Sequence, residues 1–117
     1  MKIIRGNIFV AQELISKGEE GFETLFTSED VKIEKIFTHG KITVPGNWYD
    51  QENDEWVILL QGSATLEFSG NELIKLNKGD YLFIPSHTKH RLLTTSKKPN
   101  CIWLAVHGNQ KNIQGKK

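Results

Sequence analysis

Cysteine is nearly absent from this sequence, and so is any excess of charge. The 117 residues include one cysteine, Cys101, which excludes a disulfide within the chain. Its position in the apolar run 101–106 predicts a buried thiol that packs as a small hydrophobe rather than a catalytic nucleophile. Fifteen basic residues balance fourteen acidic ones, for a net charge of +1. This balance argues against nucleic acid and against a membrane surface as partners.

Long hydrophobic runs are also missing. No run is long enough to span a bilayer, and residues 1–6 lack the apolar core of a signal peptide. Together with the single cysteine, these features favour a reducing, cytoplasmic location. The sequence also lacks a phosphate-binding glycine loop, a nucleophile elbow and a cysteine pair, so it gives no support to those classes of enzyme.

Short alternating segments make up most of the chain. Residues 11–18 predict one or two helical turns, and after them the hydrophobic period changes to two. Turn residues separate short β-strands, which we predict at 22–27, 31–38, 55–60, 63–68, 72–76, 81–85, 90–95 and 101–107. This pattern predicts one all-β domain, a sandwich or barrel. We expect residues 1–30 to form an N-terminal extension that packs on the barrel, 31–107 to form the barrel, and 108–117 to form a disordered tail.

One segment of the predicted barrel is rich in turn residues. Residues 39–54 include Gly40, Pro45 and Gly46, and they precede an apolar strand that begins near residue 55. A long loop in a small domain is uncommon and is often functional. Gly62 follows this strand and predicts a bulge or a sharp bend, as a barrel corner requires.

Two spacings in the sequence resemble the two motifs of the cupin superfamily. In the first motif, six residues separate a glutamate from a glycine, as they separate Glu55 from Gly62 here. In the second, a glycine precedes a proline and then a histidine, as Gly79 precedes Pro85 and His90. The resemblance covers the predicted barrel. It implies a double-stranded β-helix, the jelly-roll barrel, here with a short helical or irregular N-terminal segment, and a likeness to small single-domain bacterial cupins without an established activity.

The sequence departs from the first motif, because the His-x-His pair that precedes the glutamate in cupins is absent. With four residues between the pair and the glutamate, its two places fall on Trp48 and Asp50. With three residues, they fall on Tyr49 and Gln51. Of the four usual metal ligands, the resemblance therefore carries over only the glutamate and the final histidine.

These residues have two interpretations. In one, a divalent metal such as Zn, Fe, Mn or Ni is held by Glu55 and His90, with Asp50 in place of an imidazole and His39 contributed by a neighbouring strand. In the other, the barrel has lost its metal, and Glu55 is solvated or hydrogen-bonded to a neighbour. His107 is a reserve ligand in the first interpretation and a rim residue in the second.

Large and polar side chains of the loop predict a ligand pocket. Trp48 and Tyr49 lie beside the altered motif and are predicted to line the mouth of the pocket, together with Gln51. Arg91 suits a substrate carboxylate or phosphate, or else a salt bridge at the rim. The other two tryptophans are expected to fill the barrel mainly as structure.

We therefore predict a barrel that binds a small organic molecule. As an enzyme it would use Glu55 as the catalytic group, beside a metal or as a general base, in isomerase, lyase or dioxygenase chemistry. The alternative is a non-catalytic binding or sensing barrel, and the residues do not choose between the two. A homodimer is expected, because exposed apolar strand edges suit one and many small cupins form one.

Overall fold

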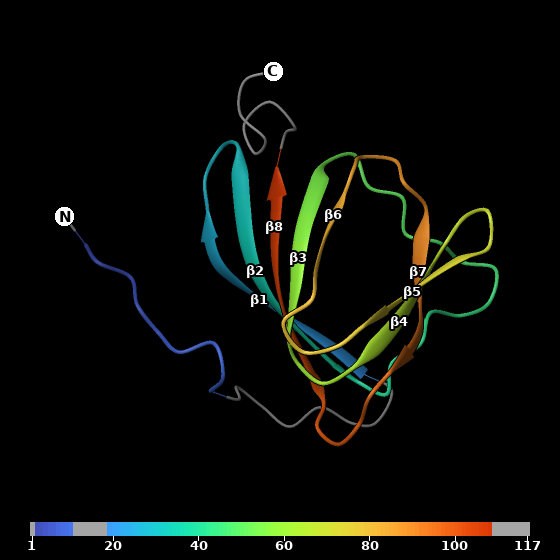
Figure 1. Cartoon of the computed structure of the whole chain (residues 1–117). Helices are drawn as coiled ribbons and strands as arrows, with labels where there is room; N and C mark the ends of the chain where they lie inside the picture. The colour runs from blue at the N-terminus through green and yellow to red at the C-terminus, as the bar shows by residue number, and fades with distance from the viewer. Residues whose placement is uncertain (1, 11–18, 109–117) are drawn as a thin grey trace.

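The structure is a computed structural model in which residues 2–10 and 19–108 are described. These residues form eight strands and no helix, in two antiparallel sheets that face each other across a shared interior (Figure 1). The larger sheet has the order β1-β2-β8-β3-β6 and the smaller one the order β5-β4-β7. The strands are β1 (Glu19–Thr27), β2 (Val31–His39), β3 (Asp54–Gln61), β4 (Ala64–Phe68), β5 (Glu72–Leu76), β6 (Tyr81–Ile84), β7 (His90–Thr95) and β8 (Cys101–Gly108).

The all-β barrel prediction is confirmed, and each of the eight predicted strands is present with ends that differ by a few residues at most. The helical turns predicted at 11–18 and the tail from residue 109 onward lie outside the described residues. Strand β1 pairs with β2 along its length, so residues 19–27 are part of the larger sheet. Among the described residues there is no helix that is long and apolar enough to cross a membrane.

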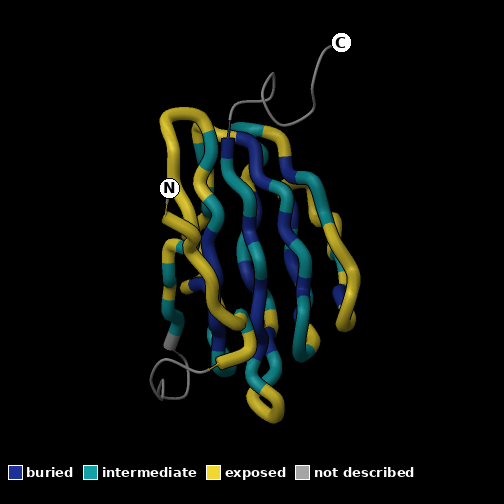
Figure 2. Tube along the Cα trace, turned by 90° about the vertical axis from the view of Figure 1, so that its left-hand side faces the viewer, coloured by how far each residue is buried: buried dark blue, intermediate teal, exposed yellow. Residues whose placement is uncertain are grey.

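The core lies between the sheets, where the inward faces of the central strands cover one another. Leu59 and Ala105 of the larger sheet are completely buried, and they pack with Leu66 and Leu92 of the smaller one. Figure 2 shows this as a band of buried residues along the central strands, with exposed residues at the turns. The alternation of buried and exposed residues along β4 is the two-residue period expected of a strand with one covered face.

The loop between β2 and β3 closes one side of the barrel. Tyr49 and His90 exchange two backbone hydrogen bonds, from Tyr49 N to His90 O at 2.7 Å and from His90 N to Tyr49 O at 3.1 Å. The backbone N–H of Thr43 donates to the carbonyl of Leu92 at 3.0 Å. The loop is therefore fixed along the outer edge of β7 and is held in place by the sheet, as a functional loop needs to be.

Gly62 lies at the corner where the chain leaves the larger sheet at the end of β3 and enters the smaller sheet at β4. Its φ of 93° is a conformation that glycine adopts readily and other residues rarely do. The sharp bend predicted at this position is confirmed.

Candidate functional site

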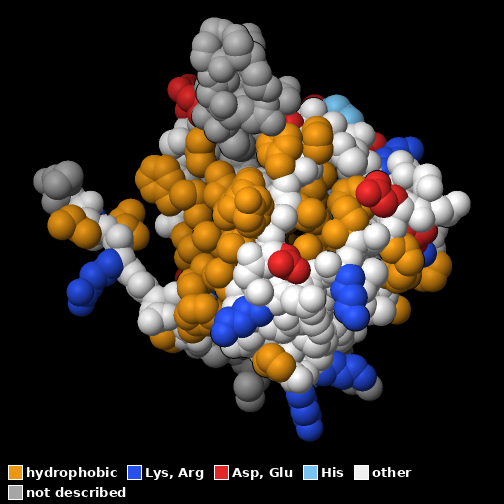
Figure 3. Space-filling model, viewed as in Figure 1, with side chains coloured by type: hydrophobic (Ala, Val, Ile, Leu, Met, Phe, Trp, Pro, Cys, Tyr) orange, Lys and Arg blue, Asp and Glu red, His pale blue; other side chains and the backbone are white. Residues whose placement is uncertain are grey.

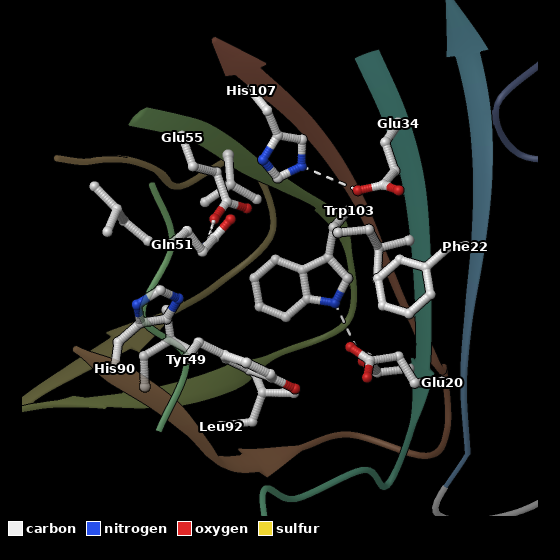
Figure 4. A pocket seen from close by; sticks show the side chains of 15 residues that line it. Glu20, Phe22, Glu34, Tyr49, Gln51, Glu55, His90, Leu92, Trp103 and His107 are labelled. Atoms are coloured by element: carbon white, nitrogen blue, oxygen red, sulfur yellow. Dashed lines mark hydrogen bonds and ion pairs between the residues drawn. The ribbon is translucent and has the colours of Figure 1, made fainter. Parts of the chain in front are cut away.

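A cavity of about 310 Å³ lies inside the barrel, and we call it the barrel cavity (Figure 4). Most of its wall is apolar and comes from strands of both sheets. In the space-filling view, hydrophobic side chains gather over β1 and β2 and continue toward the hollow between the sheets (Figure 3). Phe22, which is 59% exposed, stands at this opening. The apolar lining consists of Phe22, Ile36, Val57, Leu66, Ile84, Leu92 and Trp103.

Eight residues with polar groups complete the lining, and they come from β1, β2, β3, β7, β8 and the loop that follows β2. They are Glu20, Glu34, Thr38, Tyr49, Gln51, Glu55, His90 and His107. The volume and the mixture of apolar wall with a few convergent polar groups are typical of a site for a small organic molecule.

Glu55 is the buried carboxylate of this site. It lies near the beginning of β3, is 7% exposed, and accepts a hydrogen bond of 2.8 Å from Gln51 Nε2 to its Oε1. No described residue donates to its second oxygen. A buried carboxylate needs partners, and here a single neutral amide supplies one side of it while the other side is left to whatever occupies the cavity.

His90 is the buried imidazole of the site, at the beginning of β7. Its Nδ1 lies 2.9 Å from the carbonyl oxygen of Thr88. Because a carbonyl oxygen only accepts, Nδ1 carries the proton, and in the neutral ring Nε2 is an acceptor. The ring is fixed further by Phe68, which stacks on it with centroids 5.6 Å apart, and by Tyr49 at 5.5 Å.

Glu20 and Tyr49 form a second polar group in the cavity. The two side chains are close enough for each to influence the pKa of the other. Burial raises the pKa of Glu20, an effect that the charge of Lys41 and the hydroxyl of Tyr49 oppose in part. Burial also raises the pKa of Tyr49 above 10.0, and the negative charge of Glu20 raises it further, so the phenol is a neutral donor at physiological pH.

Glu34 and His107 form a third polar group, near the beginning of β2. His107 Nε2 lies 3.0 Å from Glu34 Oε1, and Lys32 Nζ lies 3.3 Å from Glu34 Oε2. Both oxygens of Glu34 therefore have partners. This carboxylate is 7% exposed but, unlike that of Glu55, has a cation beside it.

The structure settles which loop residues face inward. Tyr49 and Gln51 line the barrel cavity, whereas Trp48 and Asp50 do not. Asp50 Oδ1 lies 3.0 Å from His87 Nδ1 in an exposed pair. In the extended loop, alternate side chains point to opposite sides, so the two motif places occupied by Tyr49 and Gln51 are the ones that face the glutamate.

The four residues considered as metal ligands are not brought together. Glu55 and His90 both line the cavity, but Asp50 is turned toward His87. His39 ends β2 beside the pair Thr38–Cys101, whereas Glu55 pairs with His107 at the other end of β8. Cys101 and His107 are six residues apart along β8, so His39 and Glu55 lie at heights in the sheet that differ by about 20 Å. No group of three His, Cys, Asp or Glu residues suited to a metal ion occurs in the part of the chain that the structure describes.

Two of the four residues predicted to bind substrate line the cavity and two do not. Tyr49 and Gln51 contribute to the wall, but Arg91 is bound to Glu67, with Nε–Oε1 at 2.8 Å and Nη2–Oε1 at 2.7 Å. Its guanidinium also lies 5.5 Å from the Trp48 ring, outside the cavity lining. The Glu67 salt bridge is the second of the two alternatives that the sequence offered for Arg91.

Sequence reasoning missed several contributors to the wall, among them Trp103, Glu20 and Glu34. Trp103, expected to be mainly structural, lines the cavity and donates from Nε1 to Thr38 Oγ1 at 3.1 Å. Glu20 and Glu34 were not singled out. Glu34, Ile36 and Thr38 are two residues apart along β2, so their side chains lie on the same face of the strand, which is the face toward the cavity. The sequence shows that they share a face but not which face points inward.

Comparison with known proteins identifies the class. The Cupin domain family profile matches residues 37–107, which include both motifs and most of the two sheets. The chain therefore belongs to the cupin family. No curated protein of known function matches the sequence significantly.

Solved structures support the same conclusion. A protein from Ralstonia eutropha JMP134, named a putative mannose-6-phosphate isomerase, is 37% identical and superposes with a TM-score of 0.83 over 90% of this chain and 97% of its own. A cupin superfamily protein from Desulfitobacterium hafniense DCB-2 has 18% identity and a TM-score of 0.72, covering 93% and 94%. The polyketide cyclase RemF from Streptomyces resistomycificus has the same identity and TM-score, covering 92% and 80%. The last two show a shared fold alone.

Proposed function

We propose that this cupin binds a small organic molecule in the barrel cavity, with its apolar part against Trp103 and Ile36 and a polar group toward Glu55. The observation that carries the proposal is the unshared oxygen of a buried carboxylate in an otherwise apolar cavity of about 310 Å³. This oxygen faces the cavity, where a hydrogen-bond donor of a bound ligand can take the place of water beside it.

A screen of small neutral and charged organic molecules tests the binding proposal. In two-dimensional ¹H–¹⁵N NMR spectra, a ligand of the cavity shifts the indole N–H signal of Trp103, assigned with a Trp103→Phe variant. Enlarging a wall residue, as in Ile36→Trp, fills the cavity and abolishes the shift, whereas the matched enlargement of an exposed residue, Leu73→Trp, preserves it. Ligands that bind the Ile36→Trp variant as well as the parent protein would contradict binding in the cavity.

The geometry supports proton transfer as the chemistry of such a site. The free oxygen of Glu55 and Nε2 of His90 are two bases on the wall of one cavity, and neither is paired with a cation among the described residues. A general base positioned beside a bound carbon or oxygen acid abstracts its proton efficiently. This assignment makes Glu55 the catalytic base and is consistent with isomerase or lyase chemistry.

The name of the Ralstonia protein raises sugar-phosphate isomerisation as a specific form of that chemistry, and 37% identity is the observation that favours it. Transfer of a proton between neighbouring carbons needs a base of the kind that Glu55 provides. A phosphate group also needs N–H donors or cations, and no Lys or Arg of residues 2–10 and 19–108 is part of the lining. We therefore propose the proton transfer and not the phosphate specificity.

A divalent metal does not fit the residues as they are arranged. The cavity brings together only one imidazole and one carboxylate from the motif positions, and Gln51 occupies one oxygen of that carboxylate. We therefore derive no step through a metal. Elemental analysis of untagged protein tests this view, and stoichiometric Zn, Fe, Mn or Ni would contradict it.

Exchange with solvent deuterium separates catalysis from simple binding. A carbon acid that binds in the cavity should exchange its acidic C–H in D₂O in the presence of the protein, and a Glu55→Gln variant should lose the exchange while it still binds. Binding without exchange by the parent protein would make the barrel a non-catalytic binder and would remove the general-base role.

A further inference from the structure

We propose that the barrel cavity selects ligands that are neutral or positively charged and that donate hydrogen bonds, and that it discriminates against carboxylates and phosphates. This inference deepens the proposed function and rests on it. It concerns the chemical class of the ligand. It follows from the free hydrogen-bond acceptors of the wall and from the negative charge of its carboxylates.

Two of the donors on the wall bond to acceptors of the same wall. Gln51 Nε2 donates to Glu55, and Trp103 Nε1 donates to Thr38. The Tyr49 hydroxyl lies near Glu20, whose charge raises the pKa of the phenol. Acceptor positions are in excess on this wall, because it carries three carboxylates, each with about four lone-pair positions, and the Gln51 amide uses one of them on Glu55. A ligand that supplies donors can therefore use this excess.

Cations near the cavity are directed elsewhere. Lys32 lies against Glu34, with a side chain that is 47% exposed. Lys35 points to the other face of β2, where Nζ donates to the carbonyl of Val10 at 2.7 Å. Arg91 is held by Glu67. Lys41 acts on Glu20 through its charge but is not among the lining residues. An anion in the cavity would therefore have no lysine or arginine of the described part of the chain as its direct partner.

The carboxylates of the wall also influence one another across the cavity. The charge of Glu34 contributes to the raised pKa of Glu20, and the charge of Glu55 contributes to the raised pKa of Tyr49. An anionic ligand would enter this same negative field and would lose its hydration without gaining donors. Since like-charge contacts in a partly dry site are costly, we expect at least about a tenfold preference against anions.

Three matched probes test the selectivity. 2-Phenylethylamine, 2-phenylethanol and 3-phenylpropanoate share an aromatic end and differ in the charge of the other end at pH 7. Titrated into ¹⁵N-labelled protein, the amine and the alcohol should shift the Trp103 indole signal, with the carboxylate at least about tenfold weaker. A carboxylate that binds as tightly as the amine overturns the inference and leaves the proposed function standing. Failure of all three, and of the wider screen, overturns both.

Charge-removing variants identify the source of the selectivity. Glu20→Gln and Glu55→Gln each keep the size of the side chain and remove a negative charge from the wall, so each should reduce the preference for amine over carboxylate at least about threefold. Glu72→Gln, on an exposed position of β5, is the matched control and should leave the preference unchanged. A preference that survives in both cavity variants would overturn the assignment. Because the ratio compares two ligands on one protein, a uniformly weakened variant still gives a clear answer.

Discussion

Gln51 Nε2 donates a 2.8 Å hydrogen bond to Glu55 Oε1, so a residue at one place of the missing His-x-His pair binds the motif glutamate directly. In a metal-binding cupin motif these positions would be joined through an ion. Here an amide and a carboxylate are joined to each other, which keeps Glu55 oriented in the cavity and occupies one of its two oxygens.

This pair makes a measurable contribution to stability. Gln51→Leu keeps the approximate size of the side chain but leaves Glu55 without its described donor, so we expect a loss of about 1 to 3 kcal/mol in the free energy of unfolding. The double variant Gln51→Leu/Glu55→Leu should recover much of that loss, because an apolar pair needs no hydrogen bond. Urea denaturation of the parent, both single variants and the double variant measures the coupling. Additive effects of the two substitutions would contradict a direct interaction.

Restoring the histidine pair should create a metal site. Tyr49 and Gln51 share the barrel cavity with Glu55 and His90, so Tyr49→His/Gln51→His places three imidazoles and one carboxylate at the four motif positions on its wall. Addition of Zn²⁺ or Mn²⁺ should raise the melting temperature of this variant and leave that of the parent nearly unchanged.

Moving the same substitutions by one residue gives the control. Trp48→His/Asp50→His uses the other possible alignment of the motif, on side chains that do not line the cavity. It should show no metal-dependent stabilisation. A larger metal effect in this control than in the first variant would contradict the inward placement of Tyr49 and Gln51.

Alkaline pH should reveal the interaction between Glu20 and Tyr49. The folded protein raises the pKa of Tyr49 above 10.0, through burial first and the charge of Glu20 second. The unfolded chain therefore loses the phenolic proton at lower pH than the folded chain does. The contribution to stability is fully present below pH 10 and is lost as the pH rises through the folded pKa.

Ultraviolet difference spectra measure this titration directly. Tyr81, the other of the two tyrosines, is exposed and can be removed as Tyr81→Phe to isolate the signal of Tyr49. In that background the midpoint should lie above pH 10 and should fall when Glu20→Gln removes the negative charge. Glu72→Gln should leave it in place. A midpoint at or below 10 would contradict a buried phenol beside a carboxylate.

The strands and the barrel were predictable because they depend on local pattern. Two-residue alternation and the turn residues placed all eight strands, and the spacing of Glu55 from Gly62 identified the family to which the chain belongs. The composition of the wall was harder to predict, because it depends on register between distant strands. Glu20 and Tyr49 are far apart in sequence and meet only through the pairing of β1 with β2 and the attachment of the loop to β7.

The loop also shows why the two motif alignments could not be separated from sequence. Shifting the pair by one residue exchanges inward and outward side chains, and no local signal distinguishes Trp48 and Asp50 from Tyr49 and Gln51. The backbone bridge between Tyr49 and His90 sets the choice. Trp103 was underestimated for a similar reason, since a wall residue of a cavity and a core residue have the same local pattern.

The two motif glycines differ in their surroundings, and this difference gives a sharp test of the barrel corner. Gly62 and Gly79 have almost equal φ angles, 93° and 92°. A Cβ on Gly62 would lie 2.7 Å from Ser96 Oγ and 2.9 Å from Cys101 Sγ, whereas a Cβ on Gly79 meets nothing within 4 Å. Both alanine substitutions incur backbone strain of about 1 to 2 kcal/mol, but only Gly62→Ala adds a steric clash.

We therefore expect Gly62→Ala to destabilise the protein more than Gly79→Ala, by about 1 to 3 kcal/mol, the usual cost of overpacking a well-packed site. Thermal and urea unfolding of both variants measure the difference. Replacing Ser96 with alanine in the Gly62→Ala background removes the closest of the two contacts and should recover part of the loss. Equal destabilisation by the two glycine variants would mean that the corner has room for a side chain. The glycine of the first motif would then be required for its backbone conformation alone.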